Sequence, residues 1–160
     1  MINFTKEECK KIISLSNVFE KHSSNEWWGG NQTIYFAWHL ERNQITEWIF
    51  ERFLNYLKMN TNIELNKPLN VIHLQNVQKG NKFEPHIDKH SLYNIGTSLN
   101  DDYEGGELIC YNPKFIVPKI TGNIYTFYGS RLHEVTEVTN GERWSLIAFL
   151  SKDLLTNKLL

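Results

Sequence analysis

The chain has 160 residues, of which 41% are hydrophobic and 13% aromatic, so it can bury a core and is not a disordered polypeptide. Its 17 basic and 18 acidic residues give a net charge of −1 without a basic stripe, which argues against nucleic acid as a partner. No apolar run approaches the roughly 20 residues that span a bilayer, and the N-terminus lacks a signal-peptide pattern. Cys9 and Cys110 form no CxxC motif, which favours a reducing compartment. We therefore expect a soluble cytoplasmic protein with one domain over residues 1–160.

Two amphipathic helices are predicted in the first part of the chain. Thr5 and Glu8 have the spacing of a capping box at the start of a helix over about residues 5–21. Apolar residues recur at helical intervals over about residues 44–59, which predicts the second helix. We expect residues 1–68 to form a helical support.

A tryptophan-containing loop is predicted between these helices, followed by a strand-like run over residues 33–38. The loop contains Trp27 and Trp28, followed by Gly29 and Gly30. Two adjacent tryptophans cannot both face one core from an extended strand. We expect one of them to be buried and the other to line or cover a functional site.

After Pro68 the pattern changes to short β-type runs separated by glycine-containing turns. This spacing predicts a mainly β protein of the α+β class, with a double-stranded β-helix (jelly roll) of roughly eight strands over residues 69–151, braced by the two N-terminal helices. The strands are expected near residues 71–78, 93–99, 107–111, 123–128, 134–138 and 144–150.

The pair His86-x-Asp88 is the first candidate for metal chemistry. Residues two apart in a strand point to the same face, so both side chains could reach one ion. Two imidazoles and one carboxylate are the ligand set of non-haem Fe(II) oxygenases, with His133 as the third ligand from another strand. The pair alone is also compatible with a histidine satisfied in the fold beside a solvated aspartate, and His90 is an equal candidate by composition.

Arg143 and Ser145 are the candidate residues for an anionic cosubstrate. They lie two apart in a predicted strand and therefore share a face. A guanidinium can hold a carboxylate through two parallel hydrogen bonds. The alternative for Arg143 is a surface salt bridge after the turn at Asn140-Gly141.

The order of these motifs resembles a known family. His86-x-Asp88, His133 and Arg143-x-Ser145, with Gly105-Gly106 between them, resemble the Fe(II)/2-oxoglutarate-dependent oxygenases, specifically the prolyl-4-hydroxylase-like branch, over about residues 69–151. The resemblance implies that the two histidines and Asp88 bind Fe(II). It also implies that Arg143 binds the distal carboxylate of 2-oxoglutarate with help from Ser145, that dioxygen is consumed, and that ascorbate is compatible as a reductant.

Three positions depart from relatives in this superfamily. Prolyl hydroxylases tend to carry a cosubstrate-binding tyrosine nine residues before the first metal histidine, where this chain has Val77. Tyr93 and Tyr125 are candidates to replace it, although either could equally be a core aromatic residue. Collagen-type enzymes have lysine at the position of Arg143, so the match is to the broader branch. Nucleic-acid demethylases typically carry a second arginine six residues later, where Phe149 stands, which argues against that activity.

The resemblance implies a dioxygenase that hydroxylates an aliphatic C–H bond and converts 2-oxoglutarate to succinate and carbon dioxide. A peptidyl prolyl residue is the leading substrate, with a free amino acid or small metabolite as the alternative. Trp27 and Trp28 are candidate substrate contacts, because flat aromatic side chains bind extended proline-rich segments. A cupin-type metalloenzyme without 2-oxoglutarate is disfavoured by Arg143-x-Ser145. A binding module without catalytic turnover is disfavoured because all three expected metal ligands, His86, Asp88 and His133, are present.

Overall fold

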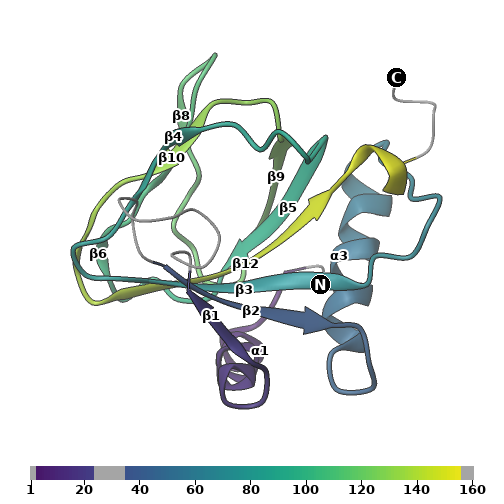
Figure 1. Cartoon of the computed structure of the whole chain (residues 1–160), viewed down its shortest axis with the longest axis horizontal. Helices are drawn as coiled ribbons and strands as arrows, with labels where there is room; N and C mark the ends of the chain where they lie inside the picture. Colours follow the sequence, from purple (N-terminus) through teal and green to yellow (C-terminus); the bar gives the residue numbers. More distant parts are fainter. Residues whose placement is uncertain (1–2, 24–34, 156–160) are drawn as a thin grey trace.

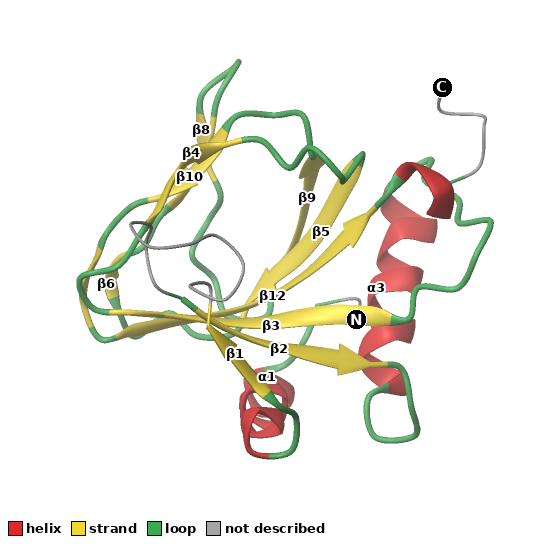
Figure 2. Cartoon of the chain, in the orientation of Figure 1, coloured by secondary structure: helices red, strands yellow, loops and turns green. Residues whose placement is uncertain are grey.

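The computed structural model describes residues 3–23 and 35–155, and these residues form a mainly β structure with antiparallel sheets and two α-helices. Figure 1 shows the larger sheet crossing the molecule, with the smaller sheet at its upper left and the helices on the other side. Figure 2 separates the same strands from the helices by colour. Trp27 and Trp28 lie outside the described residues.

The larger sheet has six strands in the order β1-β2-β3-β12-β5-β9, and every neighbouring pair is antiparallel. β12 lies at its centre and pairs with β3 on one side and β5 on the other, and both of these strands are far from β12 in sequence. Its strands are β1 (Lys21–Ser23), β2 (Phe36–Glu41), β3 (Val71–Gln78), β12 (Glu142–Leu150), β5 (Tyr93–Ser98) and β9 (Ile124–Tyr128).

The smaller sheet has four strands in the order β4-β10-β7-β8, and a further two-stranded ladder joins β11 to β6. The strand β4 is at the edge of its sheet, where Pro85 is tolerated because an edge strand has a free side. The strands are β4 (Phe83–His86), β10 (His133–Val135), β7 (Leu108–Cys110), β8 (Phe115–Ile116), β11 (Val138–Asn140) and β6 (Glu104–Gly105).

The helices α1 (Lys6–Ser14) and α3 (Glu47–Asn60) pack on one face of the larger sheet (Figure 1). The predicted capping box is present, since Thr5 and Glu8 each bond the backbone of the other. The short 3-10 helices η1 (Leu15–Asn17) and η2 (Lys152–Leu154) follow α1 and β12. No helix in the described part of the chain is long and apolar enough to cross a membrane.

The two faces of the larger sheet have different partners, as the alternation of β12 shows. Leu146 and Leu150 belong to the main core together with helix residues such as Phe53. Ile147 and Phe149 point the other way and pack in a second cluster. That cluster includes the smaller-sheet residues Leu108, Cys110 and Val135. We call the face of the larger sheet that carries Ile147 and Phe149 the inner face.

Most predicted elements are present, with four differences. The strand predicted over residues 33–38 is β2 (Phe36–Glu41), and residues 33–34 lie outside the described residues. The first helix ends at Ser14 and continues only as η1 to Asn17, so its predicted end near residue 21 was wrong. The predicted strand over residues 134–138 is two strands, because β10 pairs with β7 whereas β11 pairs with β6. The second helix begins at Glu47 rather than near residue 44. Cys9 and Cys110 are both buried and free.

Candidate functional site

The structure brings His86, Asp88 and His133 together. His86 and His133 are paired across β4 and β10, and their ring centroids lie 4.3 Å apart. The Asp88 carboxylate oxygens lie 3.5 Å from His86 Nε2 and 3.4 Å from His133 Nε2. No other group of three or more histidine, cysteine or acidic side chains in the described ranges has its ligand atoms this close. His90 is exposed in the following turn and is not part of the group.

The other nitrogen of each imidazole contacts a backbone carbonyl. His86 Nδ1 lies 2.7 Å from the Glu84 oxygen, and His133 Nδ1 lies 2.8 Å from the Arg131 oxygen. A carbonyl can only accept a hydrogen bond, so both contacts favour a proton on Nδ1 and a lone pair on Nε2. This arrangement is typical of metal-binding histidines, whose second ring nitrogen is fixed by an outer partner.

Asp88 lies outside the strand in which it was expected, and contacts from other segments hold its carboxylate in place. Our expectation that His86 and Asp88 share one strand was wrong, because β4 ends at His86 and Asp88 lies in the following loop. The loop is fixed by the Asp88 N–H, which donates to the Gly129 oxygen at 2.8 Å. Asn94 Nδ2 donates to Asp88 Oδ2 at 2.6 Å, and Ser91 Oγ donates to Asn94 Oδ1 at 2.5 Å. These two residues orient the carboxylate, and no sequence motif pointed to either of them.

Gly129 permits this loop to approach so closely. A Cβ atom at Gly129 would lie 2.0 Å from the Ser91 oxygen and 3.1 Å from the Asp88 oxygen. Any side chain at this position would therefore displace the segment that carries Asp88.

The three side chains have unequal protonation tendencies. Hydrogen bonding to Asp88 raises the pKa of His86, whereas burial lowers the pKa of His133. Burial alone would raise the pKa of Asp88, but its interactions with both histidines and Asn94 outweigh burial and lower this pKa. The Asp88 carboxyl group is therefore ionised at neutral pH, which is the form that binds metal.

These donors fit a divalent iron. With metal–ligand bonds of about 2.1 Å, neighbouring corners of an octahedron are about 3 Å apart. The separations of 3.4 and 3.5 Å between Asp88 and the two Nε2 atoms are within about half an ångström of that value. The set of two imidazoles and one carboxylate is the one that non-haem Fe(II) oxygenases use.

Arg143 lies buried on the inner face of β12, with only 4% of its surface exposed. Its Nη1 donates to Ser145 Oγ at 2.9 Å, so the predicted common face of these two residues is present. No carboxylate of the described residues forms an ion pair with Arg143. An unpaired buried cation is costly, so this arginine is suited to a ligand that brings its own negative charge.

Two tyrosines lie beside Arg143. Burial raises the pKa of Tyr125 and of Tyr103, and for both the neighbouring Arg143 works in the opposite direction. The Tyr125 ring has room beside the sheet because its cross-strand partner is Gly96. A Cβ atom at Gly96 would lie 2.8 Å from the Tyr125 ring. Tyr103 clusters with Val77, the position at which prolyl hydroxylases tend to carry their own tyrosine.

The sequence alone did not single out Tyr103, which lies outside every described strand. Its proximity to Val77 depends on a contact between segments distant in sequence, which spacing cannot reveal. Tyr93, in contrast, faces the helix side of the larger sheet, where it packs against the main core and has Tyr128 as a neighbour. The placement of Tyr93 contradicts our expectation that it could contact the cosubstrate beside Arg143.

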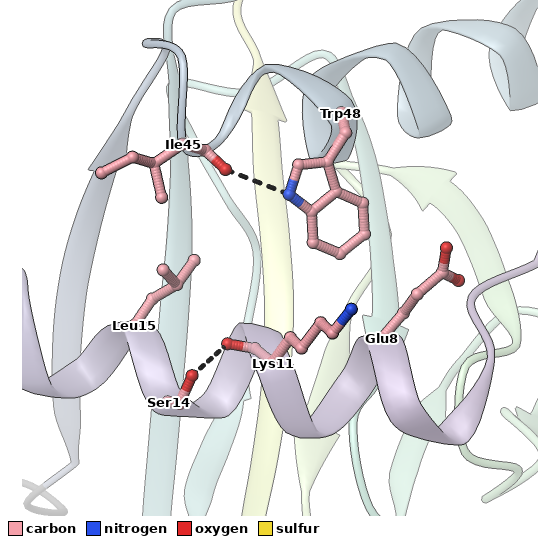
Figure 3. A pocket seen from close by; sticks show the side chains of 6 residues that line it. All are labelled: Glu8, Lys11, Ser14, Leu15, Ile45 and Trp48. Carbon is pink, nitrogen blue, oxygen red and sulfur yellow. Dashed lines mark hydrogen bonds between the residues drawn. The ribbon is translucent and has the colours of Figure 1, made fainter.

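A hollow on the helix side is a separate feature. It lies between α1 and the start of α3 and is drawn in Figure 3. Trp48 Nε1 donates to the Ile45 oxygen at 3.0 Å, and Ser14 Oγ donates to the Lys11 oxygen at 2.6 Å. Glu8, its only acidic lining residue, is bound by Arg52 at 2.7 Å. This hollow contains none of the metal-binding side chains described above.

Comparison with protein families decides the class of this site. Residues 72–151 match the model of the 2OG-Fe(II) oxygenase superfamily, and this segment contains His86, Asp88, His133 and Arg143. The chain belongs to this superfamily. It is therefore an oxidoreductase that uses Fe(II), 2-oxoglutarate and dioxygen. Comparison with curated protein sequences gives no significant match.

Solved structures share the fold of this oxygenase at low sequence identity. A 2OG-Fe(II) oxygenase family oxidoreductase from Burkholderia pseudomallei has a TM-score of 0.72 and 17% identity over 97% of this chain and 84% of that chain. A Pseudomonas putida prolyl-4-hydroxylase has a TM-score of 0.67 and 15% identity over 91% and 83%. A Trichoplax adhaerens prolyl hydroxylase, in complex with a hypoxia inducible factor peptide fragment, has 0.70 and 14% over 89% and 76%.

Proposed function

We propose that His86, Asp88 and His133 hold the Fe(II) of this oxygenase, and that Arg143 binds the distal carboxylate of 2-oxoglutarate. The observation that carries the cosubstrate assignment is the buried Arg143 guanidinium, which lacks an acidic partner among the described residues and lies on the inner face of β12. Bound iron, with 2-oxoglutarate and dioxygen, supplies the oxidising chemistry. The two sheets that face each other across this site support a jelly-roll core over residues 69–151.

The protein side chains have positioning roles in this proposal. Asn94 orients Asp88, and the backbone carbonyls next to the two histidines fix their Nε2 atoms toward one point. Ser145 and Tyr125 complete the carboxylate site by offering hydroxyl groups beside Arg143, and Tyr103 supplies a second phenol. No side chain is needed as a general base.

We propose hydroxylation of an aliphatic C–H bond, with a peptidyl prolyl residue as the substrate. The support is the likeness of the fold to prolyl hydroxylases, one of which was solved with a peptide fragment. A free amino acid or a small metabolite is the alternative substrate. A cupin-type reaction without 2-oxoglutarate would leave Arg143 as an uncompensated buried cation.

The test is the conversion of 2-oxoglutarate to succinate. Purified protein with Fe(II) and 2-oxoglutarate should form succinate, and a His133→Ala variant should not, because two ligands leave the iron weakly held. A His90→Ala variant serves as the matched control, since His90 is exposed and outside the metal group. Equal succinate formation by the His133→Ala and wild-type proteins would contradict the proposed metal site.

A further inference from the structure

The Asn100 side chain continues the pairing of β12 at the point where β5 has ended. Beyond the end of β5, the Leu99 N–H still donates to the Trp144 oxygen at 2.9 Å. The next two bonds come from the Asn100 amide. Its Oδ1 accepts from the Trp144 N–H at 2.8 Å, and its Nδ2 donates to the Glu142 oxygen at 2.8 Å. Asn100 therefore holds the backbone of β12 on both sides of Arg143.

A side chain has this role because the main chain leaves the larger sheet here. Residues 100–106, which we call the Tyr103 loop, depart from β5 and form the short strand β6 against β11. Without Asn100, the Trp144 N–H and the Glu142 oxygen would lose these partners, whereas backbone groups of a buried strand are almost always paired. An asparagine side chain offers one carbonyl and one amide nitrogen, as a peptide unit does, so it suits both groups.

The Tyr103 loop is fixed by the same amide and by two further contacts. Asn100 Nδ2 donates to Asp102 Oδ1 at 2.7 Å, next to Tyr103. Lys119 Nζ donates to the Tyr103 backbone oxygen at 2.7 Å and lies 4.3 Å from the centre of the Tyr103 ring. Gly106 leaves room for this ring, since a Cβ atom there would lie 2.8 Å from Tyr103 Cε2. The Tyr103 ring therefore has little freedom to move.

The Tyr103 side chain lies beside Arg143 and Val77. Val77 is directly opposite Arg143 in the ladder between β3 and β12, and it packs with Tyr103 and Val138 in one small cluster. Tyr103 is 5% exposed, and its phenol oxygen accepts a hydrogen bond from Arg143. A phenol that accepts from a guanidinium still has its own proton to donate to a carboxylate. Valine has no polar group, so the hydroxyl next to Val77 comes from the loop.

We propose that Asn100 is a positioning residue for the cosubstrate, which sets the Arg143 guanidinium and the Tyr103 phenol at the spacing that one carboxylate of 2-oxoglutarate requires. The proposal rests on the proposed function and deepens it. Arg143 is carried by β12, whereas Tyr103 is carried by the loop. The two groups can hold the same carboxylate only if strand and loop stay in register, and Asn100 bonds both.

The contacts of Asn100 are separate from those that hold the metal ligands. Within the described chain, the side-chain hydrogen bonds of Asn100 go to Asp102, Glu142 and Trp144 only. Asp88 is oriented by Asn94 instead, and each metal-binding histidine is oriented by a backbone carbonyl two residues before it. Loss of Asn100 should therefore affect the distal carboxylate of 2-oxoglutarate and leave its iron-binding end unchanged.

The test compares two 2-oxoacids that differ at the distal end. 2-Oxopentanoate has the same chain as 2-oxoglutarate but a methyl group in place of the distal carboxylate. Calorimetry of the Fe(II)-loaded protein without dioxygen gives the Kd of each. The wild type should prefer 2-oxoglutarate by about tenfold or more. Asn100→Ala should raise the Kd of 2-oxoglutarate about tenfold, the lower end of what loss of an outer partner costs a metal ligand, and change that of 2-oxopentanoate by less than about twofold.

Asn66→Ala is the matched control, because Asn66 Nδ2 also donates to a backbone oxygen, that of Leu155 at 2.9 Å, beyond the other end of β12. This control should change neither Kd. Asn100→Asp keeps the acceptor for the Trp144 N–H and loses both donated bonds, so it should show the same selective loss if Asn100→Ala does not fold. An Asn100 variant that binds 2-oxoglutarate like the wild type, or that weakens both 2-oxoacids equally, would overturn the proposal. A wild type that binds both 2-oxoacids with equal affinity refutes the proposed role of Arg143 instead.

Discussion

Replacing Arg143 with methionine should strongly weaken 2-oxoglutarate binding while leaving the ligand-free protein no less stable. Arg143 is 4% exposed, and no described carboxylate pairs with it. Removing one partner of a buried charge pair costs roughly 2–5 kcal/mol, so the dissociation constant of 2-oxoglutarate should rise by about thirtyfold to several thousandfold. In the ligand-free protein the same change removes an uncompensated cation and supplies an apolar side chain of similar volume, which is often neutral or stabilising.

Thermal unfolding with and without 2-oxoglutarate measures both quantities. At a ligand concentration of about 100 times the dissociation constant, the wild type should gain about 2.7 kcal/mol. For a chain of this length that corresponds to a rise in Tm of about 5–10 °C. At the same ligand concentration the Arg143→Met variant should gain less than about 1 kcal/mol, and its ligand-free Tm should equal or exceed that of the wild type.

Arg52 provides the matched control, because it is partly buried but paired with Glu8 at 2.7 Å and bonded to the Asn3 oxygen. The Arg52→Met variant should lose stability and keep the full response to 2-oxoglutarate. The reasoning would be refuted if the Arg143→Met variant bound 2-oxoglutarate like the wild type. It would also be refuted if this variant lost as much ligand-free stability as the Arg52→Met variant.

Three further changes test the surroundings of the site. Asn94→Ala removes the bond that orients Asp88 and should weaken metal affinity about 10–100-fold in a metal titration, with the fold retained by circular dichroism. Gly96→Ala should raise the dissociation constant of 2-oxoglutarate, because its Cβ would lie 2.8 Å from the Tyr125 ring and displace it. The pKa of His73 falls from 6.5 to about 4 on folding, so the unfolded chain binds more protons between these values, and stability should decrease by about 3 kcal/mol as pH falls from 6.5 to 4. A His73→Phe variant, compared by denaturant unfolding of metal-free protein, should lack that contribution, and an unchanged slope would contradict it.

The sequence predicts the parts of this fold that depend on local patterns. The helices, the capping box at Thr5 and Glu8, and most strands follow from periodicity and turn residues, and the structure confirms them. The sequence pattern also predicts that Arg143 and Ser145 share a face, because two residues of one strand need no knowledge of other strands. What it could not give is the division of residues 134–138 between two ladders, which depends on partners elsewhere in the chain.

The same limit applies to the candidate site, because local sequence patterns do not reveal contacts between residues that are distant in the chain. The gathering of His86 with His133 is a cross-strand pairing that only a family resemblance anticipated. Asn94 and Tyr103 act through contacts made in three dimensions, so no spacing points to them. The choice between Tyr93 and Tyr125 depended on which face of the sheet each occupies. Both lie in predicted strands, and only the pairing register tells them apart.

The strand β12 explains why stability and chemistry are linked in this protein. One set of its residues packs under the helices, including Leu146 and Leu150, while the alternate set carries Arg143 and Ser145 on the inner face. A shift of one residue in the pairing of β12 would exchange the two sets and put a cation into the main core. The apolar half of the strand therefore holds the polar half in place, and the burial that fixes the register also keeps water from the Arg143 guanidinium.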